Sequence, residues 1–222
     1  MQTVVVGGHS RNIGKTSVMA GLMRGLSSFG WTAVKITQHR HELSSPQDEP
    51  SASAPAEHDF DLTEERTGDG RGDTSRYLAA GAKRSLWLRV ERGSLQKAFP
   101  ALVRALGRDP FVMIESNSIL GFLKPDVYVV VLDSRARDFK PSARKFLERA
   151  DVLVPVGSLD ARAWPGLDPR GFRAKPVFTI SPRDYFNPEL CRFIRQRLHL
   201  SGAASSQNEP RLSCRKEQNW QH

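Results

Sequence analysis

The residues best suited to chemistry in this sequence are Gly14-Lys15-Thr16, which follow a short apolar run at residues 3–7. Glycine, lysine and a hydroxyl residue in this order, between a strand and a helix, are typical of a loop that binds phosphate groups. The usual pattern, G-x-x-x-x-G-K-[ST], would place its first glycine at position 9, where this chain has His9. Gly8 stands one position earlier, so the loop holds one extra residue between its glycines. We expect the turn to begin earlier and His9 to fill space in it, with the lysine and the helix start unchanged.

This loop predicts a site for a nucleoside triphosphate. Backbone N–H groups at a helix N-terminus point toward one spot, where the helix dipole also favours an anion. Lys15 would reach the β- and γ-phosphates, and the hydroxyl of Thr16 would ligate Mg²⁺. A chance triplet at a helix start is the alternative, but the position, the preceding strand and the amphipathic helix after Lys15 all agree. The residues predicted to contact the nucleotide are Gly8, Ser10, Arg11, Asn12, Ile13, Gly14, Lys15, Thr16 and Ser17.

A phosphate loop works with a carboxylate at the end of another strand, which holds Mg²⁺ directly or through water. Glu115 directly follows the apolar run at 111–114 and suits this role. Asp133 and Asp73 are competitors, and either could instead be a solvated carboxylate or, for Asp73, a helix cap. We predict Thr16, Glu115 and Asp73 as metal ligands and Lys15, Glu115 and Asp73 as the catalytic group.

Basic and metal-binding residue types also occur at the end of the second apolar run, residues 32–37. His39 and His41 could hold a metal, but side chains two apart in an extended segment also simply share one face. With no third ligand nearby we favour the simpler interpretation. Lys35 is placed to meet an anionic ligand at the carboxyl edge of the sheet.

The elements that must position these residues alternate along the chain. Expected strands cover residues 3–7, 32–37, 86–90, 111–115, 127–133, 152–156 and 176–180. Expected helices run from Lys15 to about Gly30 and over 73–82 (capped by Asp73 or Thr74), 95–106, 141–150 and 187–198, with Pro100 either kinking or starting the third. Continuous apolarity in the central strands is typical of a sheet covered on both faces. The pattern predicts an α/β fold of three layers, with a mostly parallel central sheet and helices on both faces.

Length and composition limit the protein class. A chain of 222 residues allows one domain, which we place at residues 1–200, with a polar disordered tail at 201–222. Residues 42–72 are expected to be a flexible loop, because 44–57 contain prolines and serines but no large apolar group. No apolar run is long enough to span a membrane and no leader segment is visible, so we expect a cytoplasmic protein with free thiols at Cys191 and Cys214. The net charge of +9 is scattered, which disfavours nucleic acid as a partner.

Three segments of the chain resemble the molybdopterin-guanine dinucleotide biosynthesis protein B (MobB) family. They are the loop GGHSRNIGKTS, the segment VKITQHRHE with Lys35, His39 and His41, and above all GDTSRYLAAGA at 72–82. The resemblance, which covers about residues 3–133, implies a P-loop NTPase fold and a GTP- and Mg²⁺-binding protein that assists the attachment of GMP to molybdopterin. It also implies a molybdenum cofactor guanylyltransferase as a partner, and a homodimer is compatible with it.

The chain departs from the family in ways that bear on the ligand. Glu115 is followed by Ser116 where the family has glycine, the phosphate loop is one residue longer, and the loop before residue 72 is expanded. No Asn-Lys-x-Asp motif that would read guanine is visible, so the choice between GTP and ATP stays open.

Three functions compete on this evidence. The first is a nucleotide-binding protein with slow Mg²⁺-dependent hydrolysis, for which Arg11 is the one candidate arginine finger within the loop. The second is an ATP-dependent small-molecule kinase or ligase, with Lys35, His39 and Asp73 contacting the acceptor. The third is a non-enzymatic adaptor that changes partners when nucleotide binds.

Overall fold

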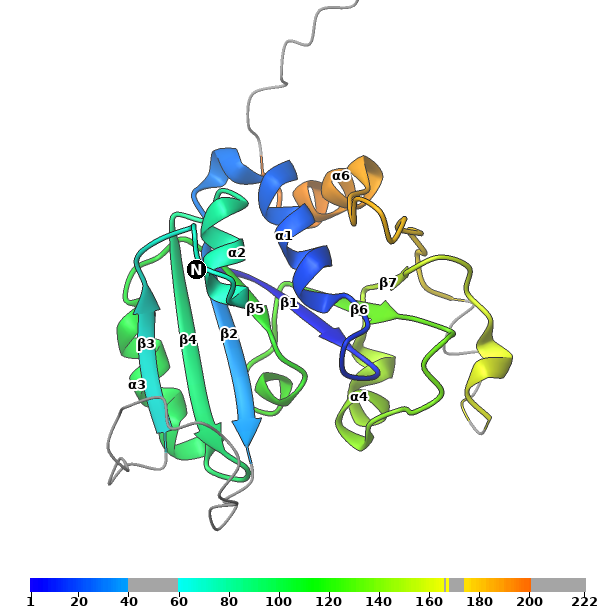
Figure 1. Ribbon diagram of the computed structural model, residues 1–222, viewed down its shortest axis with the longest axis horizontal. Helices are drawn as coiled ribbons and strands as arrows, with labels where there is room; N and C mark the ends of the chain where they lie inside the picture. Colours follow the sequence, from blue (N-terminus) through cyan, green and yellow to red (C-terminus); the bar gives the residue numbers. More distant parts are fainter. Residues whose placement is uncertain (40–59, 166, 168–173, 201–222) are drawn as a thin grey trace, which may run out of the picture.

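A mostly parallel sheet forms the centre of the protein in the computed structural model, which describes residues 1–39, 60–165, 167 and 174–200. Among these residues the sheet has seven strands in the order β3-β4-β2-β5-β1-β6-β7 (Figure 1). All neighbouring strands run parallel except β3 and β4. The strands are β1 (Gln2–Gly8), β2 (Thr32–His39), β3 (Phe60–Glu65), β4 (Arg84–Glu91), β5 (Phe111–Glu115), β6 (Val127–Leu132) and β7 (Val152–Pro155). The α-helices are α1 (Lys15–Gly25), α2 (Asp73–Ala79), α3 (Leu95–Leu106), α4 (Pro141–Phe146) and α6 (Pro188–Arg197).

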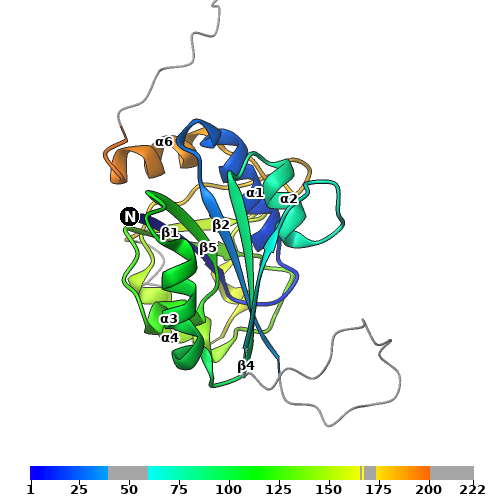
Figure 2. The same cartoon turned by 90° about the vertical axis from the view of Figure 1, so that its left-hand side faces the viewer.

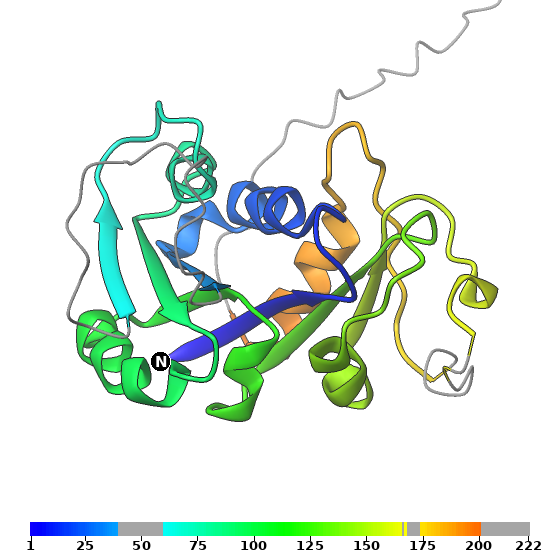
Figure 3. The ribbon, with the colours of Figure 1, turned by 60° about the horizontal axis from the view of Figure 1, so that its bottom comes forward.

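Helices cover both faces of the sheet, and the alternation of side chains along each strand divides the core between them. In β1, Val4 and Val6 pack in the layer shared with α1, α2 and α6, whereas Val5 packs in the layer shared with α3 and α4. Figures 2 and 3 show α1 on one side of the strands and α3 and α4 on the other. Each of these valines is fully buried, which contributes roughly 1.5–3 kcal/mol per side chain.

The predicted fold class is confirmed. The chain has three layers, a mostly parallel sheet and helices on both faces. Strands were found in the expected ranges from residues 3–7 to 152–156, and helices near 95–106 and 187–198. Pro100 lies inside α3 and does not start it. Residues 42–59 of the expected flexible loop and residues 201–222 of the expected tail lie outside the described part of the chain. His41 and Cys214 lie outside it as well.

Two predictions for the first half of the chain were wrong in detail. The expected loop at 42–72 contains β3, an antiparallel edge strand paired with β4. The first helix ends at Gly25, and Gly30, at φ 65°, terminates instead a short 3₁₀ turn, Ser27–Phe29. In the first case the sequence pattern did not reveal the edge strand, and in the second it did not separate the 3₁₀ turn from the helix before it.

Three further boundaries differ. The helix expected at 141–150 is α4 followed by a 3₁₀ turn, Leu147–Arg149. The strand expected at 176–180 makes only isolated parallel bridges, of Val177 with Leu153 and of Ile180 with Val156. Neither Asp73 nor Thr74 caps α2, because Gly72 occupies the N-cap and Asp73 is the first helical residue.

No helix among the described residues is both long and apolar enough to cross a bilayer.

We predict that Gly21→Ala lowers the free energy of unfolding by about 1–3 kcal/mol. A Cβ at Gly21 would lie 2.1 Å from the carbonyl oxygen of Tyr185, so α1 and the C-terminal segment would have to separate. Gly121→Ala is the control, since a Cβ there meets nothing within 4 Å. Urea unfolding of both variants measures the difference, and equal midpoints would contradict this close contact.

Candidate functional site

The loop between β1 and α1 has the backbone of a phosphate-binding turn. Asn12 and Gly14 both adopt left-handed φ angles, 56° and 89°, immediately before α1 begins at Lys15. The value at Gly14 favours glycine, because a side chain there would be strained and its Cβ would lie 2.5 Å from the ring of Tyr185. These angles turn the chain sharply between the end of β1 and the amino end of α1.

Lys15 lies in a partly buried and strongly cationic environment. Its ammonium group donates a 2.6 Å hydrogen bond to the carbonyl oxygen of Ser10, across the loop. The pKa of Lys15 is lowered from 10.5 to about 8, mainly by burial and also by the charges of Lys140 and Lys35, while the charge of Glu115 opposes the shift. A bound anion would favour the charged ammonium, so this lysine is suited to hold a phosphate.

Oxygen ligands and one lysine meet where β2, β5 and α1 come together. The register places Lys35 of β2 directly beside Glu115 of β5. The ammonium of Lys35 lies 2.6 Å from Glu115 Oε1, 2.9 Å from Asp73 Oδ2 and 3.3 Å from Thr16 Oγ1. Thr16 also donates a 2.8 Å hydrogen bond to Glu115 Oε2. The structure therefore brings together the three residues predicted as metal ligands.

This set of donors fits Mg²⁺. Mg²⁺ prefers hard oxygen ligands and is usually held by one or two carboxylates together with phosphate and water. The Lys35 ammonium already contacts one oxygen each of Thr16, Glu115 and Asp73, so all three face a common cation. In the part of the chain that the structure describes, no three His, Cys, Asp or Glu side chains form a metal cluster. Phosphate oxygens and water would therefore have to complete the coordination.

Helix α2 supports this centre from one side. The hydroxyl of the buried Tyr77 donates to Glu115 Oε2, and burial, with the nearby Glu115 charge, raises the pKa of Tyr77. Arg76 donates a 2.9 Å hydrogen bond to Ser17 Oγ and lies 3.6 Å from Asp73. The segment 72–82 that carried the family resemblance thus contacts both the phosphate loop and the acidic residue of β5.

Asn117 is a site residue that the sequence analysis missed. Its side chain accepts a 2.9 Å hydrogen bond from the N–H of Gly8 and donates a 2.8 Å hydrogen bond to the carbonyl oxygen of the same residue. It therefore holds both backbone groups of Gly8, where β1 ends and the loop begins. The one sequence signal for this role was the position of Asn117, an amide side chain two residues after the predicted metal ligand Glu115.

His9 does more than fill the wider turn. It is fully buried, its Nδ1 donates to the carbonyl oxygen of Asp138 at 2.8 Å, and its Nε2 accepts the N–H of Asp133 at 3.0 Å. The ring also contacts Phe139 and Trp164, with centroids 5.2 and 4.7 Å away. The extra residue of the loop is thus a bridge between β1 and the segment after β6.

We predict that His9→Ala lowers the free energy of unfolding by about 3 kcal/mol, since it creates a cavity and leaves a buried N–H unpaired. Burial lowers the pKa of His9, so below about pH 6.5 the unfolded chain binds more protons than the folded one. The contribution of His9 is therefore complete above that pH and falls on acidification. Urea unfolding at about pH 8 and about pH 5.5 should show a smaller acid loss in His9→Ala than in wild type. Equal losses would contradict the neutral, buried imidazole.

A cavity of about 1230 Å³ opens at this edge of the sheet and is lined by most of the predicted site residues. Gly8, Arg11, Asn12, Gly14, Lys15, Thr16, Ser17, Asp73 and Glu115 all line it. Ile13 is buried in the core, and the Ser10 hydroxyl donates to Asp138 at 2.5 Å, so neither side chain lines the cavity. Only backbone groups of these two residues would be available to a phosphate.

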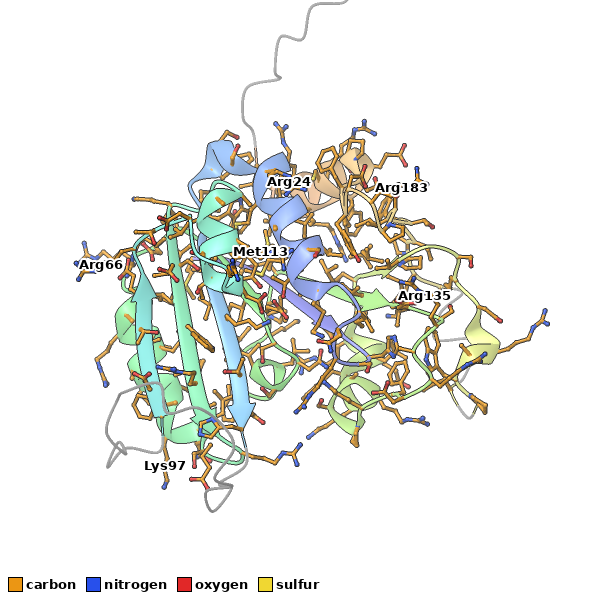
Figure 4. The ribbon with its side chains drawn as sticks, viewed as in Figure 1. Arg24, Arg66, Lys97, Met113, Arg135 and Arg183 are labelled. Atoms are coloured by element: carbon orange, nitrogen blue, oxygen red, sulfur yellow. The ribbon has the colours of Figure 1, made fainter. Side chains whose placement is uncertain are left out.

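The remaining candidates lie elsewhere. Asp133 forms a 2.8 Å ion pair with Arg135, and hydrogen bonding to Arg135 lowers the pKa of Asp133. Figure 4 shows Arg135 on the side of the phosphate loop that faces away from β2. The carboxylate of Asp133 does not line the cavity, so Asp133 is not the partner of the loop. His39 is exposed at the end of β2 and is not part of the cavity wall either. Cys191 is a free, buried thiol, as expected.

Comparisons with known proteins give only distant structural likenesses. No family model matches the chain, and no curated protein matches it. One similar solved structure is LpxK from Aquifex aeolicus in complex with ATP, at 17% identity and a TM-score of 0.47 over 81% of this chain. The chain spans only 53% of the length of LpxK. Another is HypB from Helicobacter pylori in complex with nickel, at 14% identity and a TM-score of 0.46, over 92% of this chain and 91% of HypB.

Proposed function

We propose that this protein binds a nucleoside triphosphate together with Mg²⁺ in the cavity at the carboxyl edge of its sheet. The observation that carries the proposal is the meeting of Lys15, Thr16 and Glu115 around a left-handed turn at the start of α1. Backbone amides and Lys15 would hold the phosphates, and Thr16, Glu115 and Asp73 would hold Mg²⁺. When bound, Mg²⁺ would neutralise charge on the phosphate oxygens.

Any hydrolysis by the protein alone is proposed to be slow. Phosphoryl transfer depends on positioning and on charge stabilisation, and here Lys15 and the loop amides supply the charge. Arg11 lines the cavity from within the loop and is the candidate for an arginine that assists in cis. Glu115 is already engaged by Thr16, Lys35 and Tyr77, which suits a metal ligand better than a base that must accept a proton from water.

The finer assignment rests on the resemblance to the MobB family. We propose GTP as the nucleotide, a role in forming molybdopterin guanine dinucleotide, and a molybdenum cofactor guanylyltransferase as the partner of a cytoplasmic protein. The segment 72–82 supports this proposal, because α2 contributes Asp73, Arg76 and Tyr77 to the site. Adding the protein to a guanylyltransferase reaction should raise the yield of the dinucleotide. An unchanged yield would contradict this role.

The proposed homodimer has a separate test. Sedimentation of the purified protein should give twice the mass of one chain, and the mass of a single chain would contradict the homodimer.

Titration with GTP and with ATP, with Mg²⁺ and with a chelator, tests the proposal. We expect Mg²⁺-dependent binding at micromolar or lower Kd, with GTP preferred by about tenfold or more. Preference for ATP would contradict the GTP assignment and favour an ATP-dependent kinase or ligase. Binding to neither nucleotide would contradict the proposed function as a whole.

A further inference from the structure

The cavity carries more positive charge than one triphosphate site uses. Among the described residues, six basic and three acidic side chains line it. Lys15 belongs to the phosphate loop, and Lys35 and Arg76 already contact Asp73. Three further basic side chains line the cavity, namely Arg11, Arg92 and Lys140, and of these only Arg11 belongs to the phosphate loop.

These three side chains come from separate elements that converge on one opening. Arg92 directly follows β4, Arg11 lies in the phosphate loop, and Lys140 directly precedes α4. In the sheet, β2, β5 and β1 stand between β4 and β6, so Arg92 after β4 and Lys140 before α4 line the cavity from well-separated elements. The backbone N–H of Lys140 donates to the carbonyl oxygen of His9 at 2.8 Å, which ties its position to the loop.

No described carboxylate lies within 4 Å of the charged groups of these three side chains. Elsewhere in the protein, Arg84, Arg89 and Arg197 each form an ion pair. Burial lowers the pKa of Lys140, and the charges of Arg11, Arg92 and Lys35 lower it further. Asp138 offsets part of this repulsion, but its carboxylate accepts the Ser10 hydroxyl. The cluster is thus mutually repulsive, and a bound anion would relieve that repulsion.

We propose that Arg92 and Lys140, assisted by Arg11, form a second anion subsite that binds the phosphate group of a small phosphorylated molecule beside the triphosphate. This inference rests on the proposed function, because it treats the phosphate loop as occupied by nucleotide. A phosphate monoester carries up to two negative charges and several acceptor oxygens, which suit a guanidinium group and an ammonium group that line one cavity from separate elements. A dicarboxylate such as malonate has a similar charge but divides it between two separate planar groups, so it cannot present that charge on one compact centre. The cavity volume of about 1230 Å³ leaves room for a second small ligand.

Calorimetry on protein saturated with Mg²⁺ and a non-hydrolysable nucleotide tests this subsite. Inorganic phosphate and glycerol 3-phosphate should bind at one equivalent, and malonate should bind at least about fivefold more weakly. Arg92→Gln and Lys140→Gln should each weaken phosphate binding by about tenfold. Their affinity for the nucleotide should change by less than about threefold. Arg108→Gln, at an exposed arginine outside the cavity, and Lys124→Gln are the matched controls and should leave both affinities unchanged.

The possible outcomes separate the two proposals. Normal nucleotide binding with no phosphate binding, or with phosphate binding that both variants retain, would overturn the second subsite alone. Equal loss of nucleotide and phosphate affinity would also overturn it, because Arg92 and Lys140 would then belong to the triphosphate site. Stronger binding of malonate than of phosphate would overturn the assigned ligand class. A failed nucleotide titration of the wild type would instead contradict the proposed function.

Discussion

Replacing Lys15 by alanine is expected to reduce the affinity for Mg²⁺–nucleotide by at least about 100-fold, which corresponds to about 2.7 kcal/mol. The ammonium group of Lys15 reaches across the turn of the phosphate loop, where it donates a hydrogen bond to the carbonyl oxygen of Ser10. Its partial burial makes a contact with phosphate stronger than the same contact in water, because less solvent screens the charges. The pKa of about 8 means that the free protein holds this proton less firmly than an ordinary lysine does.

The same substitution should leave the fold intact. Lys15→Ala removes a partly buried charge and one hydrogen bond, and alanine favours the first turn of α1, so stability should change by about 1 kcal/mol or less. Calorimetric titration and urea unfolding of one preparation separate the two effects. Lys124→Ala, an exposed lysine outside the cavity, serves as the control. Nucleotide affinity within about threefold of wild type in Lys15→Ala would contradict the proposed triphosphate site.

Strands buried on both faces were the part of the fold that the sequence predicted best. Val4 to Val6 and the run from Val127 to Leu132 are apolar at every position, because helices cover both sides of the sheet there. β3 has no such pattern. Its residues, FDLTEE, are half-buried or exposed on an edge strand, and their acidic and apolar side chains do not alternate regularly. Only pairing with β4 places them in the sheet, and pairing is not visible in a single sequence.

The site was predictable where its residues are close in sequence and less so where distant strands meet. Lys15 and Thr16 follow from a local pattern, and Glu115 follows from its place at the end of an apolar run. The ion pair of Lys35 with Glu115 depends on the register of β2 with β5.

The roles of His9 and Asn117 likewise depend on long-range contacts. His9 bridges to the segment after β6, and Asn117 binds the backbone of Gly8, more than 100 residues away in the chain. No local spacing rule could have assigned these contacts, because each one joins segments that only the folded sheet brings together.

Glu115→Gln is expected to lower the free energy of unfolding by about 3 kcal/mol, because it leaves the ammonium of Lys35 without its nearest counter-charge. Both side chains are largely withdrawn from water, with exposed fractions of 14% for Lys35 and 4% for Glu115. Asp73 contacts the same ammonium at 2.9 Å but is itself 39% exposed, so solvent weakens its compensation.

The double variant Glu115→Gln/Lys35→Met separates the charge pair from the metal role. With both charges removed, the stability loss should be smaller than the sum of the single losses by about 2 kcal/mol in a double-mutant cycle. Mg²⁺ should nevertheless fail to strengthen nucleotide binding in Glu115→Gln and in the double variant alike, since both lack the carboxylate predicted to hold it. Glu148→Gln, at an exposed glutamate on the outer surface, is the control for the charge change.

Urea unfolding supplies the coupling energy, and nucleotide titrations with and without Mg²⁺ supply the metal effect. A coupling below about 0.5 kcal/mol would mean that Lys35 and Glu115 do not depend on each other. A full Mg²⁺ effect in Glu115→Gln would exclude this carboxylate as a metal ligand and leave Thr16 and Asp73 as the candidates. The two readouts are independent because the double variant restores charge balance without restoring a carboxylate. Recovery of stability without recovery of the Mg²⁺ effect is therefore the result expected of a residue that both supports the sheet edge and binds the metal.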